Sequence, residues 1–489
     1  MGRRRRGVLR RIKKKGGEGG YIRIQNKSSV EVEIKIVDGR KNIDDVGMDK
    51  IVGIIKPGES LPKEGQNPFD DDSDDDDDDG PPAVYQYIEG DVRNRFQKDG
   101  FFHLEAHPTK DGKPSSSLTL VVDHNSWESK DTTPDIDSSV KLVADVDEED
   151  KDNGNGNNDN WKIELRVYDN YNPKKWMEEY GTKHQLGKKR LCDVGIPGTH
   201  DSGTYKFNKK YGASPESGLT KVEDILDHGK LLGKVTDFVL QNIFERLCQC
   251  QDLSIKEQLH QGIRYFDLRV AYHSKSQNYM TCHGVYCVNI KEILQEIKDF
   301  ITENTKEIII LEFKKLFEME ELQYNELANI VIDILGVDKV ADRTKVKQTS
   351  TIQEYWNNNY QIVCLYQKRD PLTANIQSKF WSLSYINSPW PNAGDNVELY
   401  SKLHEYVHDH DNDTFFVLQG LLTPDVELIK NEILESGGLS IKQISNKCKG
   451  CIVDWVEEEW KPTNRLNIVI VDFFQNCSII PSIINYNRT

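Results

Sequence analysis

Strand-type and helix-type patterns alternate from about Arg190 to the end of this 489-residue chain. Apolar runs of strand length are followed by stretches with helical apolar spacing, such as the stripe from Ile293 to Ile301. Parallel strands need long crossover connections, which are usually helices. The alternation therefore predicts an α/β domain over 185–489, and the number of units favours a TIM-type (β/α) barrel. The expected strands include Lys189–Ile196, Ile263–Tyr272, Glu307–Phe313, Gln361–Tyr366, Thr414–Leu418 and Leu466–Phe473.

Residues 20–175 have a different pattern, in which short strand-type runs are separated by turns. Many runs alternate apolar and polar side chains, which is the period of a half-buried strand. Two insertions, at about 66–82 and 147–160, are too polar to contribute to a core. We predict a small antiparallel, sandwich-like β domain that follows a basic tail at 1–19. The expected strands are Tyr21–Gln25, Val30–Val37, Lys50–Ile55, Gly100–Ala106, Ser117–Val122 and Trp161–Tyr168.

Charge is distributed unevenly along the chain. The net charge of −16 argues against nucleic acid as the main partner. Residues 1–15, however, carry nine positive and no negative charges, which favours attraction to an anionic membrane surface. Nuclear localisation or nonspecific polyanion binding is an alternative for this tail. A third is masking by the acidic run at 70–79, which carries nine negative charges.

Hydropathy and cysteine content indicate the cellular compartment in which the protein is expected. The sequence contains no apolar stretch of about 18 residues, the length that a membrane-spanning helix needs. The nine cysteines are an odd number and all lie from Cys192 onward, and we interpret them as reduced thiols. We therefore expect a cytoplasmic protein that associates peripherally with membranes.

Histidine and charged side chains occur where several expected strands end. His200 follows a Pro-Gly turn at the end of the first expected strand. Asp267 and Arg269 are two positions apart on another, so both project from one face. Burying charged side chains costs several kcal/mol unless they are paired with opposite charges or used in function. Their place on this strand therefore favours a functional site over a packing role.

Three further positions belong to the same expected rim. His283 follows a short strand-type run, Lys314 ends the run Ile308–Phe313, and Asp472 ends the run that starts at Ile468. Barrel enzymes carry their chemistry at the carboxyl ends of the strands. Two histidines, carboxylates and two cations are the groups needed for general acid–base catalysis with an anionic transition state.

Four motifs together resemble the X domain of phosphatidylinositol-specific phospholipase C. They are IPGTHDS at 196–202, GIRYFDLR at 262–269, HG at 283–284 and NTKEIIILEFKK at 304–315. They occur in the order of the family, and the resemblance runs from about Leu191 to Phe474. It implies cleavage of phosphatidylinositol, or of glycerophosphoinositol, to inositol 1,2-cyclic phosphate, with diacylglycerol as the other product of the lipid.

The resemblance also implies a role for each matched residue. His200 matches the general base that deprotonates the inositol 2-hydroxyl, and His283 matches the general acid that protonates the leaving oxygen. Arg269 matches the cation that stabilises charge on the phosphoryl oxygens. Lys314 matches a substrate-contacting lysine. The acidic members of the implied catalytic set are Asp201, which supports proton transfer, Asp267 beside it, and Asp472, the candidate that orients His200.

The charges at these positions indicate whether catalysis needs a metal ion. The calcium-dependent branch of the family has Asn after the first histidine and carboxylates where this chain has Arg269 and Lys314. Those cations cannot ligate a metal ion, but they can replace its charge. We therefore expect no catalytic metal and no cofactor, although the carboxylate of Glu312 lies next to these positions.

Two alternative functions remain open at this stage. One is a lipid-binding or scaffold protein whose barrel is catalytically inactive, and the other is a barrel phosphodiesterase for a different head group. The aromatic loop around Trp381 and Trp390 is consistent with either lipid contact or ordinary packing.

Overall fold

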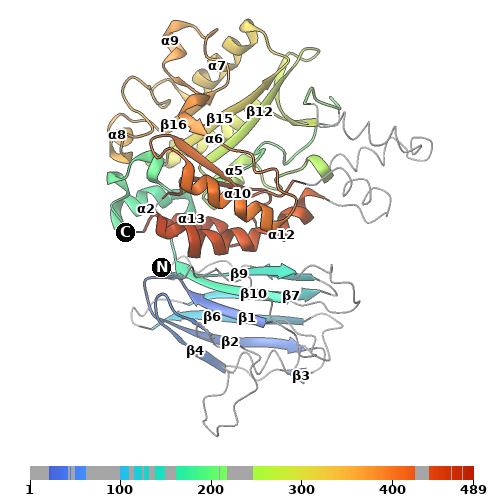
Figure 1. The fold of residues 1–489 in the computed structure, drawn as a ribbon, viewed down its shortest axis with the longest axis vertical. Coiled ribbons are helices and arrows are strands. Elements are labelled where there is room, and N and C mark those ends of the chain that lie inside the picture. Colours follow the sequence, from blue (N-terminus) through green and yellow to red (C-terminus); the bar gives the residue numbers. More distant parts are fainter. Residues whose placement is uncertain are drawn as a thin grey trace, which may run out of the picture. The chain divides into compact units, whose positions relative to one another are not determined.

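The computed structural model divides the chain into two compact units, Met1–Asp169 and Asn170–Thr489 (Figure 1). It describes residues 21–41, 44–45, 50–61, 100–109, 115–123, 126–130, 138–148, 161–208, 210–216, 246–423, 440–463, 465–475 and 477–488. The basic residues 1–15, the acidic run and most of the second polar insertion lie outside these ranges.

The first unit contains two β-sheets. In the four-stranded sheet the order is β5-β1-β10-β9, and in the six-stranded sheet it is β3-β2-β6-β7-β8 with β4 on β2. Alternate side chains such as Val32 and Ile34 are buried, which explains why the alternating pattern marks these strands. The strands are β1 Tyr21–Asn26, β2 Val32–Lys41, β3 Asp44–Asp45, β4 Lys50–Ile55, β5 Ser60–Leu61, β6 Gly100–Pro108, β7 Ser116–Asp123, β8 Ser126–Lys130, β9 Val140–Glu148 and β10 Trp161–Asp169.

Three features of this unit differ from the sequence expectation. Strands β1 and β10 pair in parallel, so the unit is not purely antiparallel. Strands β3, β5, β8 and β9 were not predicted, and β9 extends through Glu148 into the expected polar insertion. The pattern of β9 was not recognised as a strand because Asp145, Asp147 and Glu148 make its second half acidic and interrupt the alternation of apolar and polar residues.

The second unit is built on a curled, mostly parallel sheet. Its main order is β17-β16-β15-β12-β11-β20-β19-β18, in which most strands pair with their neighbours along the chain and the first strand, β11, pairs with the last, β20. The hairpin β13–β14 extends antiparallel from β12. The strands are β11 Ile196–Thr199, β12 Tyr265–His273, β13 Asn278–His283, β14 Val285–Asn289, β15 Ile309–Phe317, β16 Ile362–Tyr366, β17 Phe380–Ser382, β18 Ile386–Asn387, β19 Phe415–Gln419 and β20 Ile468–Val471.

The expected closed barrel is found only in part. The eight parallel strands follow the cyclic order of a barrel, but β17 and β18 are not joined by a ladder within the described residues. These strands have three and two residues, and the 3₁₀ turn Leu383–Tyr385 connects them. The first expected strand, Lys189–Ile196, is also wrong. Three of its eight residues form a 3₁₀ turn at Leu191–Asp193, and the strand starts only at Ile196.

Helices connect and cover the strands of this sheet. Capping boxes open several of them, including the one that starts after Ser254. Helices α10, α12 and α13 pack beside one another (Figure 1). The described helices are α2 Trp176–Lys183, α5 Ile255–Gln261, α6 Ile290–Glu303, α7 Glu321–Leu335, α8 Ile352–Asn357, α9 Ala374–Gln377, α10 Asn396–Asp409, α12 Ile441–Asp454, followed by a π-helical turn at Trp455–Trp460, and α13 Ile479–Tyr486.

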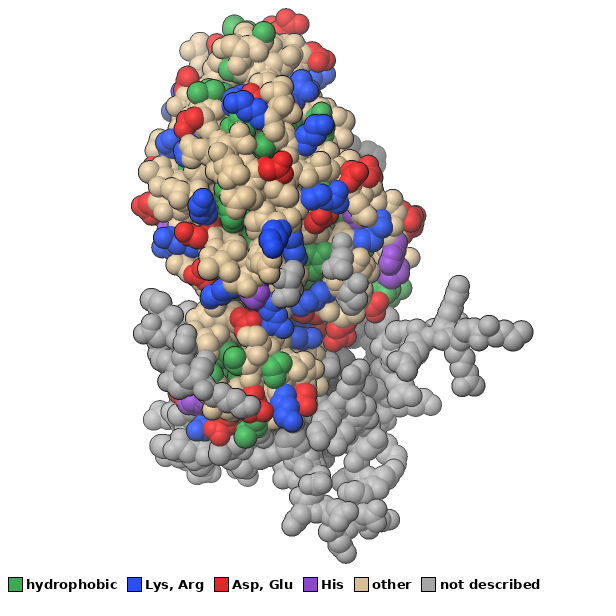
Figure 2. Space-filling model, turned by 90° about the vertical axis from the view of Figure 1, so that its left-hand side faces the viewer, with side chains coloured by type: hydrophobic (Ala, Val, Ile, Leu, Met, Phe, Trp, Pro, Cys, Tyr) green, Lys and Arg blue, Asp and Glu red, His purple; other side chains and the backbone are tan. Residues whose placement is uncertain are grey.

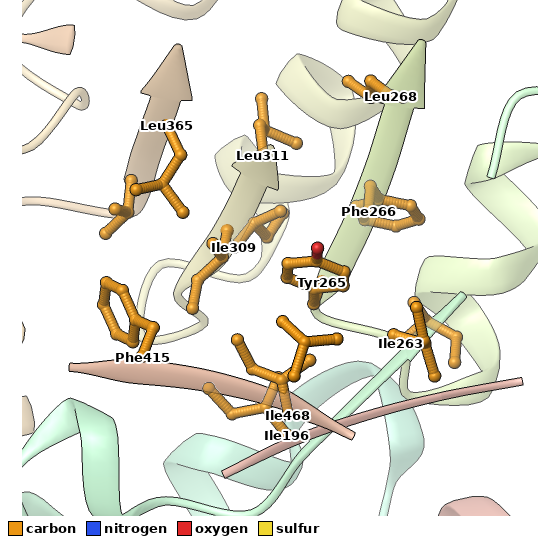
Figure 3. Close-up of a cluster of buried hydrophobic side chains, with 14 of the residues drawn as sticks. Ile196, Ile263, Tyr265, Phe266, Leu268, Ile309, Leu311, Leu365, Phe415 and Ile468 are labelled. Atoms are coloured by element: carbon orange, nitrogen blue, oxygen red, sulfur yellow. The ribbon is translucent and has the colours of Figure 1, made fainter. Parts of the chain in front are cut away.

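Apolar side chains from many strands of the second unit meet in one core. Figure 3 shows Ile196 of β11, Ile309 and Leu311 of β15, Leu365 of β16 and Ile468 of β20 in one cluster. All five are fully buried, and burying a side chain of this size contributes about 1.5–3 kcal/mol. This core fixes the strands whose carboxyl ends carry the charged residues.

No helix in the described part of the chain has both the length and the apolarity needed to cross a bilayer. The nine cysteines are free thiols. Figure 2 shows one face of the molecule, on which described Lys and Arg side chains are interspersed with Asp and Glu side chains.

Candidate active site

His200 and Asp472 emerge side by side from two paired strands. Strands β11 and β20 are parallel with Thr199 opposite Val471, so the residue after each strand lies at the same edge. The pairing is close at Gly198, where a Cβ would lie 2.7 Å from Tyr265 and 2.8 Å from Ile470. His200 Nδ1 consequently lies 2.9 Å from Asp472 Oδ1.

The hydrogen bonds of His200 assign its tautomer. Nδ1 carries the proton and donates a hydrogen bond to Asp472, while Nε2 accepts a hydrogen bond of 2.9 Å from Arg269 Nη2. Burial of His200 opposes protonation, but the carboxylates of Asp201 and Asp472 outweigh it and raise the pKa of the imidazole. The neutral ring thus has a basic lone pair on Nε2.

Asp201 lies between the two histidines. Its Oδ2 is 3.4 Å from His200 Nε2 and 3.6 Å from His283 Nε2. Its φ of 40° is in the left-handed region, which is uncommon for a residue with a side chain and often marks a functional position. Burial raises the pKa of Asp201 even though Arg269 Nε lies 2.7 Å from its Oδ1.

His283 is the more accessible of the two histidines. It ends β13, and its side chain is 25% exposed against 6% for His200. Its Nδ1 donates to the carbonyl oxygen of Cys248 at 2.9 Å, which leaves Nε2 toward Asp201 and the open side of the site. The two imidazole centroids are 6.3 Å apart.

Arg269 and Lys314 supply positive charge among the carboxylates. Both lie beside Asp267, with distances to its Oδ2 of 3.9 Å from Arg269 Nη2 and 3.5 Å from Lys314 Nζ. Burial would raise the pKa of Asp267, but Lys314 and Arg269 outweigh that effect and lower it. Lys314 also donates to Ser388 Oγ at 3.1 Å.

Four residues that the sequence analysis did not assign to the site also contribute to it. Glu216 Oε1 accepts a hydrogen bond of 2.9 Å from Arg269 Nη1. Gln251 Nε2 donates to the backbone oxygens of His200 and Val471, and Ser445 Oγ donates to that of Asp472. Gln419 Nε2 holds the loop before Trp390 by bonds to Ser388 and Pro389. Gln419 ends the buried strand β19, Ser445 lies on α12, and the other two lie in loops. None of the four belongs to a distinctive motif, so no sequence signal identified them.

The two tryptophans of the aromatic loop have different environments. Trp381 is fully buried, so packing explains it. Trp390 is 44% exposed and its ring centroid lies 5.9 Å from that of His200. Trp390 therefore forms part of the rim of the site.

Potential metal ligands gather at the same place. Among the described residues, one group of three such side chains has its ligand atoms within 4.8 Å of one another: His200, Asp201 and Cys250. Arg269 already contacts His200 and Asp201, and burial raises the pKa of the Cys250 thiol well above its usual range. Glu312 is turned to the hydroxyl of Tyr265, which donates to it. These contacts favour a site whose positive charge comes from the chain itself.

Comparison with known proteins agrees with the sequence motifs. Residues 240–367 match the family model for phosphatidylinositol-specific phospholipase C, X domain. Over these residues, the second unit is similar to the phosphatidylinositol-specific phospholipase C X-domain family. The matched residues include Asp267, Arg269, His283 and Lys314, whereas His200 and Asp472 lie outside them.

The curated proteins and solved structures that this chain resembles are distant in sequence. Human PI-PLC X domain-containing protein 3 is 24% identical over 300 residues, which cover 61% of this chain and 88% of that protein. Mouse PI-PLC X domain-containing protein 2 is 26% identical over 306 residues, which cover 61% and 83%. The solved phosphatidylinositol-specific phospholipase C of Listeria monocytogenes has a TM-score of 0.45 and 18% identity, covering 65% of this chain and all of that one.

Proposed function

We propose that this chain is a metal-independent phosphodiesterase that cleaves phosphatidylinositol, or glycerophosphoinositol, to inositol 1,2-cyclic phosphate. The observation that carries this proposal is the pair of histidines on either side of Asp201, each with its Nδ1 proton already engaged by a protein acceptor. Such a pair suits a reaction that removes one proton and delivers another at opposite ends of the reacting group. Its curled sheet is proposed as a TIM-type barrel that is open at one seam.

In the proposed first half of the reaction, His200 Nε2 takes the proton of the inositol 2-hydroxyl. Asp472 stabilises the imidazolium that forms, because its carboxylate accepts a hydrogen bond from the Nδ1–H group. The 2-oxygen then forms a bond to phosphorus. The guanidinium of Arg269 stabilises the negative charge on the phosphoryl oxygens.

In the second half the bond between phosphorus and the glycerol oxygen breaks. His283 gives the proton on its Nε2 to that oxygen, and the products are the cyclic diester and the free alcohol. Asp201 Oδ2 lies within 3.6 Å of both Nε2 atoms, so it stabilises whichever imidazole is protonated. Lys314 and Asp267 are proposed to bind the hydroxyl groups of the substrate.

We further propose that the protein acts at the cytoplasmic surface of anionic membranes. The support is the basic segment 1–15, because each Lys or Arg near such a surface contributes about 1 kcal/mol.

A head-group panel tests the proposed substrate. Vesicles that contain phosphatidylinositol, phosphatidylcholine or phosphatidylethanolamine would be incubated with the full chain, with His200→Ala as the inactive control. We expect diacylglycerol release from the phosphatidylinositol vesicles alone. Diacylglycerol release from another lipid would favour a different head group. If no lipid released diacylglycerol, and a separate assay showed no release of glycerol from glycerophosphoinositol, the inactive lipid-binding alternative would be favoured.

A further inference from the structure

Arg269 blocks the catalytic base in the conformation of this structure. Its Nη2 donates to His200 Nε2 at 2.9 Å, which is the lone pair that the substrate hydroxyl needs. The same guanidinium is held by Asp201 on Nε and by Glu216 on Nη1. Substrate binding therefore has to displace at least one of these contacts.

Glu216 is placed firmly beside Arg269. The segment before it pairs with the β13–β14 turn, since Tyr286 N donates to the Gly212 oxygen and Ser214 N donates to the Gly284 oxygen. This turn follows directly after His283. Glu216 is consequently anchored to the hairpin that presents the second histidine, and only 8% of its surface is exposed.

The carboxylate of Glu216 is incompletely satisfied there. One oxygen accepts from Arg269, while Oε2 is buried and has no hydrogen-bond partner among the described residues. A buried polar atom without a partner costs free energy, so this contact is held less favourably than a complete ion pair. The oxygens of Asp201, which also contacts Arg269, lack hydrogen-bond partners in the described part of the chain too, but Asp201 lies between the two histidines and is 1% exposed against 8% for Glu216. Glu216 is therefore the contact on Arg269 that an incoming anion can reach more readily.

We propose that Glu216 is a stand-in for the phosphate of the substrate, and that the phosphodiester displaces it from Arg269. This inference rests on the proposed phosphodiesterase function and adds a specificity determinant to it. Phosphate oxygens can pair with Nη1 and Nη2 together, as guanidinium–phosphate pairs commonly do. That bidentate contact draws Nη2 away from His200 Nε2 and frees the base only when a phosphate is present.

The consequence is that Glu216 weakens phosphate binding. Glu216→Gln keeps the shape and an acceptor oxygen for Nη1 but removes the competing negative charge. We expect it to bind myo-inositol 1-phosphate about tenfold more tightly than the unchanged chain, measured by isothermal titration calorimetry. The KM for a soluble substrate should fall in the same proportion.

Two further variants make the test decisive. Glu216→Ala removes both the charge and the contact, so it should also bind the phosphate more tightly. Glu398→Gln removes the same charge from an exposed ion pair with Lys402 on α10 and should leave binding unchanged. Equal or weaker binding by both Glu216 variants would mean that Glu216 only positions Arg269 and would overturn the proposal. Failure of the unchanged chain to bind the compound would overturn the proposed function as well.

Discussion

The imidazole of His200 and the carboxylate of Asp472 lie 2.9 Å apart although 272 positions separate them in the chain. Their strands start from paired residues, so the parallel register between Ile196 and Ile468 determines where both side chains emerge. This contact holds the Nδ1 proton of His200 and, together with Asp201, raises the pKa of the imidazole.

Removing the Asp472 charge should change the pH profile as well as the rate. His200 must be neutral to accept a proton, so activity falls as pH drops through its pKa. Because that pKa is raised, the acidic limb of kcat/KM should lie above about pH 6.5, the unperturbed histidine value. In Asp472→Asn the limb should move to lower pH and kcat should fall on the order of 10²-fold.

The matched control for this variant is Glu398→Gln, which removes an equal charge from α10 without touching either histidine. Stopped assays across pH 5–9 with a soluble substrate measure both profiles. An acidic limb at the same pH in Asp472→Asn and in the unchanged chain would show that Asp472 does not tune the base.

The two histidines should respond differently to the leaving group. His283→Ala should reduce the rate with a glyceryl leaving group by about 10²–10⁴-fold, since that oxygen needs a proton. With p-nitrophenolate, a stable anion, the same variant should retain most activity. His200→Ala should be impaired with both substrates, because the nucleophile must still be deprotonated. Equal losses with both substrates for His283→Ala would remove it as the general acid.

Catalysis should not require a metal ion. Arg269 and Lys314 place positive charge beside Asp201 and Asp267, so we expect full activity in excess EDTA. Arg269→Asp should lose activity when no calcium is added, because the positive charge at the phosphoryl group is replaced by a negative one. Inactivation of the unchanged chain by EDTA, reversed by calcium, would contradict this expectation.

Deletion of residues 1–15 should weaken membrane binding without affecting the chemistry. We expect less sedimentation with phosphatidylserine-containing vesicles at low salt, since nine positive charges are lost. Turnover of a soluble short-chain substrate should be unchanged. Because masking by the acidic run also depends on salt, the deletion is more informative than a salt series. Equal vesicle binding by the two proteins would contradict the membrane role.

The individual strands of the second unit were easier to predict from the sequence than the closure of its sheet into a barrel. The apolar runs that became β12, β15, β16 and β20 were visible because each is buried and of strand length. The open seam at β17 and β18 was not, because strands of three and two residues carry no periodicity. The segment Lys189–Ile196 looked like a strand, but a 3₁₀ turn occupies Leu191–Asp193, so the strand starts only at Ile196.

The site shows a similar division. His200 and Asp472 could be placed from the strand ends on which they stand, and the structure brings them into contact. Glu216 could not be placed, because it reaches Arg269 through a loop that pairs with the β13–β14 turn. Such long-range contacts depend on the packing of the whole unit and leave no local pattern.

The most direct test of the proposed reaction is a phosphorus NMR time course with phosphatidylinositol in mixed micelles, with and without EDTA. We predict that a resonance of the five-membered cyclic phosphodiester appears first and at the same rate in both samples, and that His200→Ala abolishes it. Direct formation of inositol 1-phosphate with no cyclic species at any time would contradict attack by the 2-hydroxyl, and an unchanged substrate signal would contradict the enzymatic activity itself.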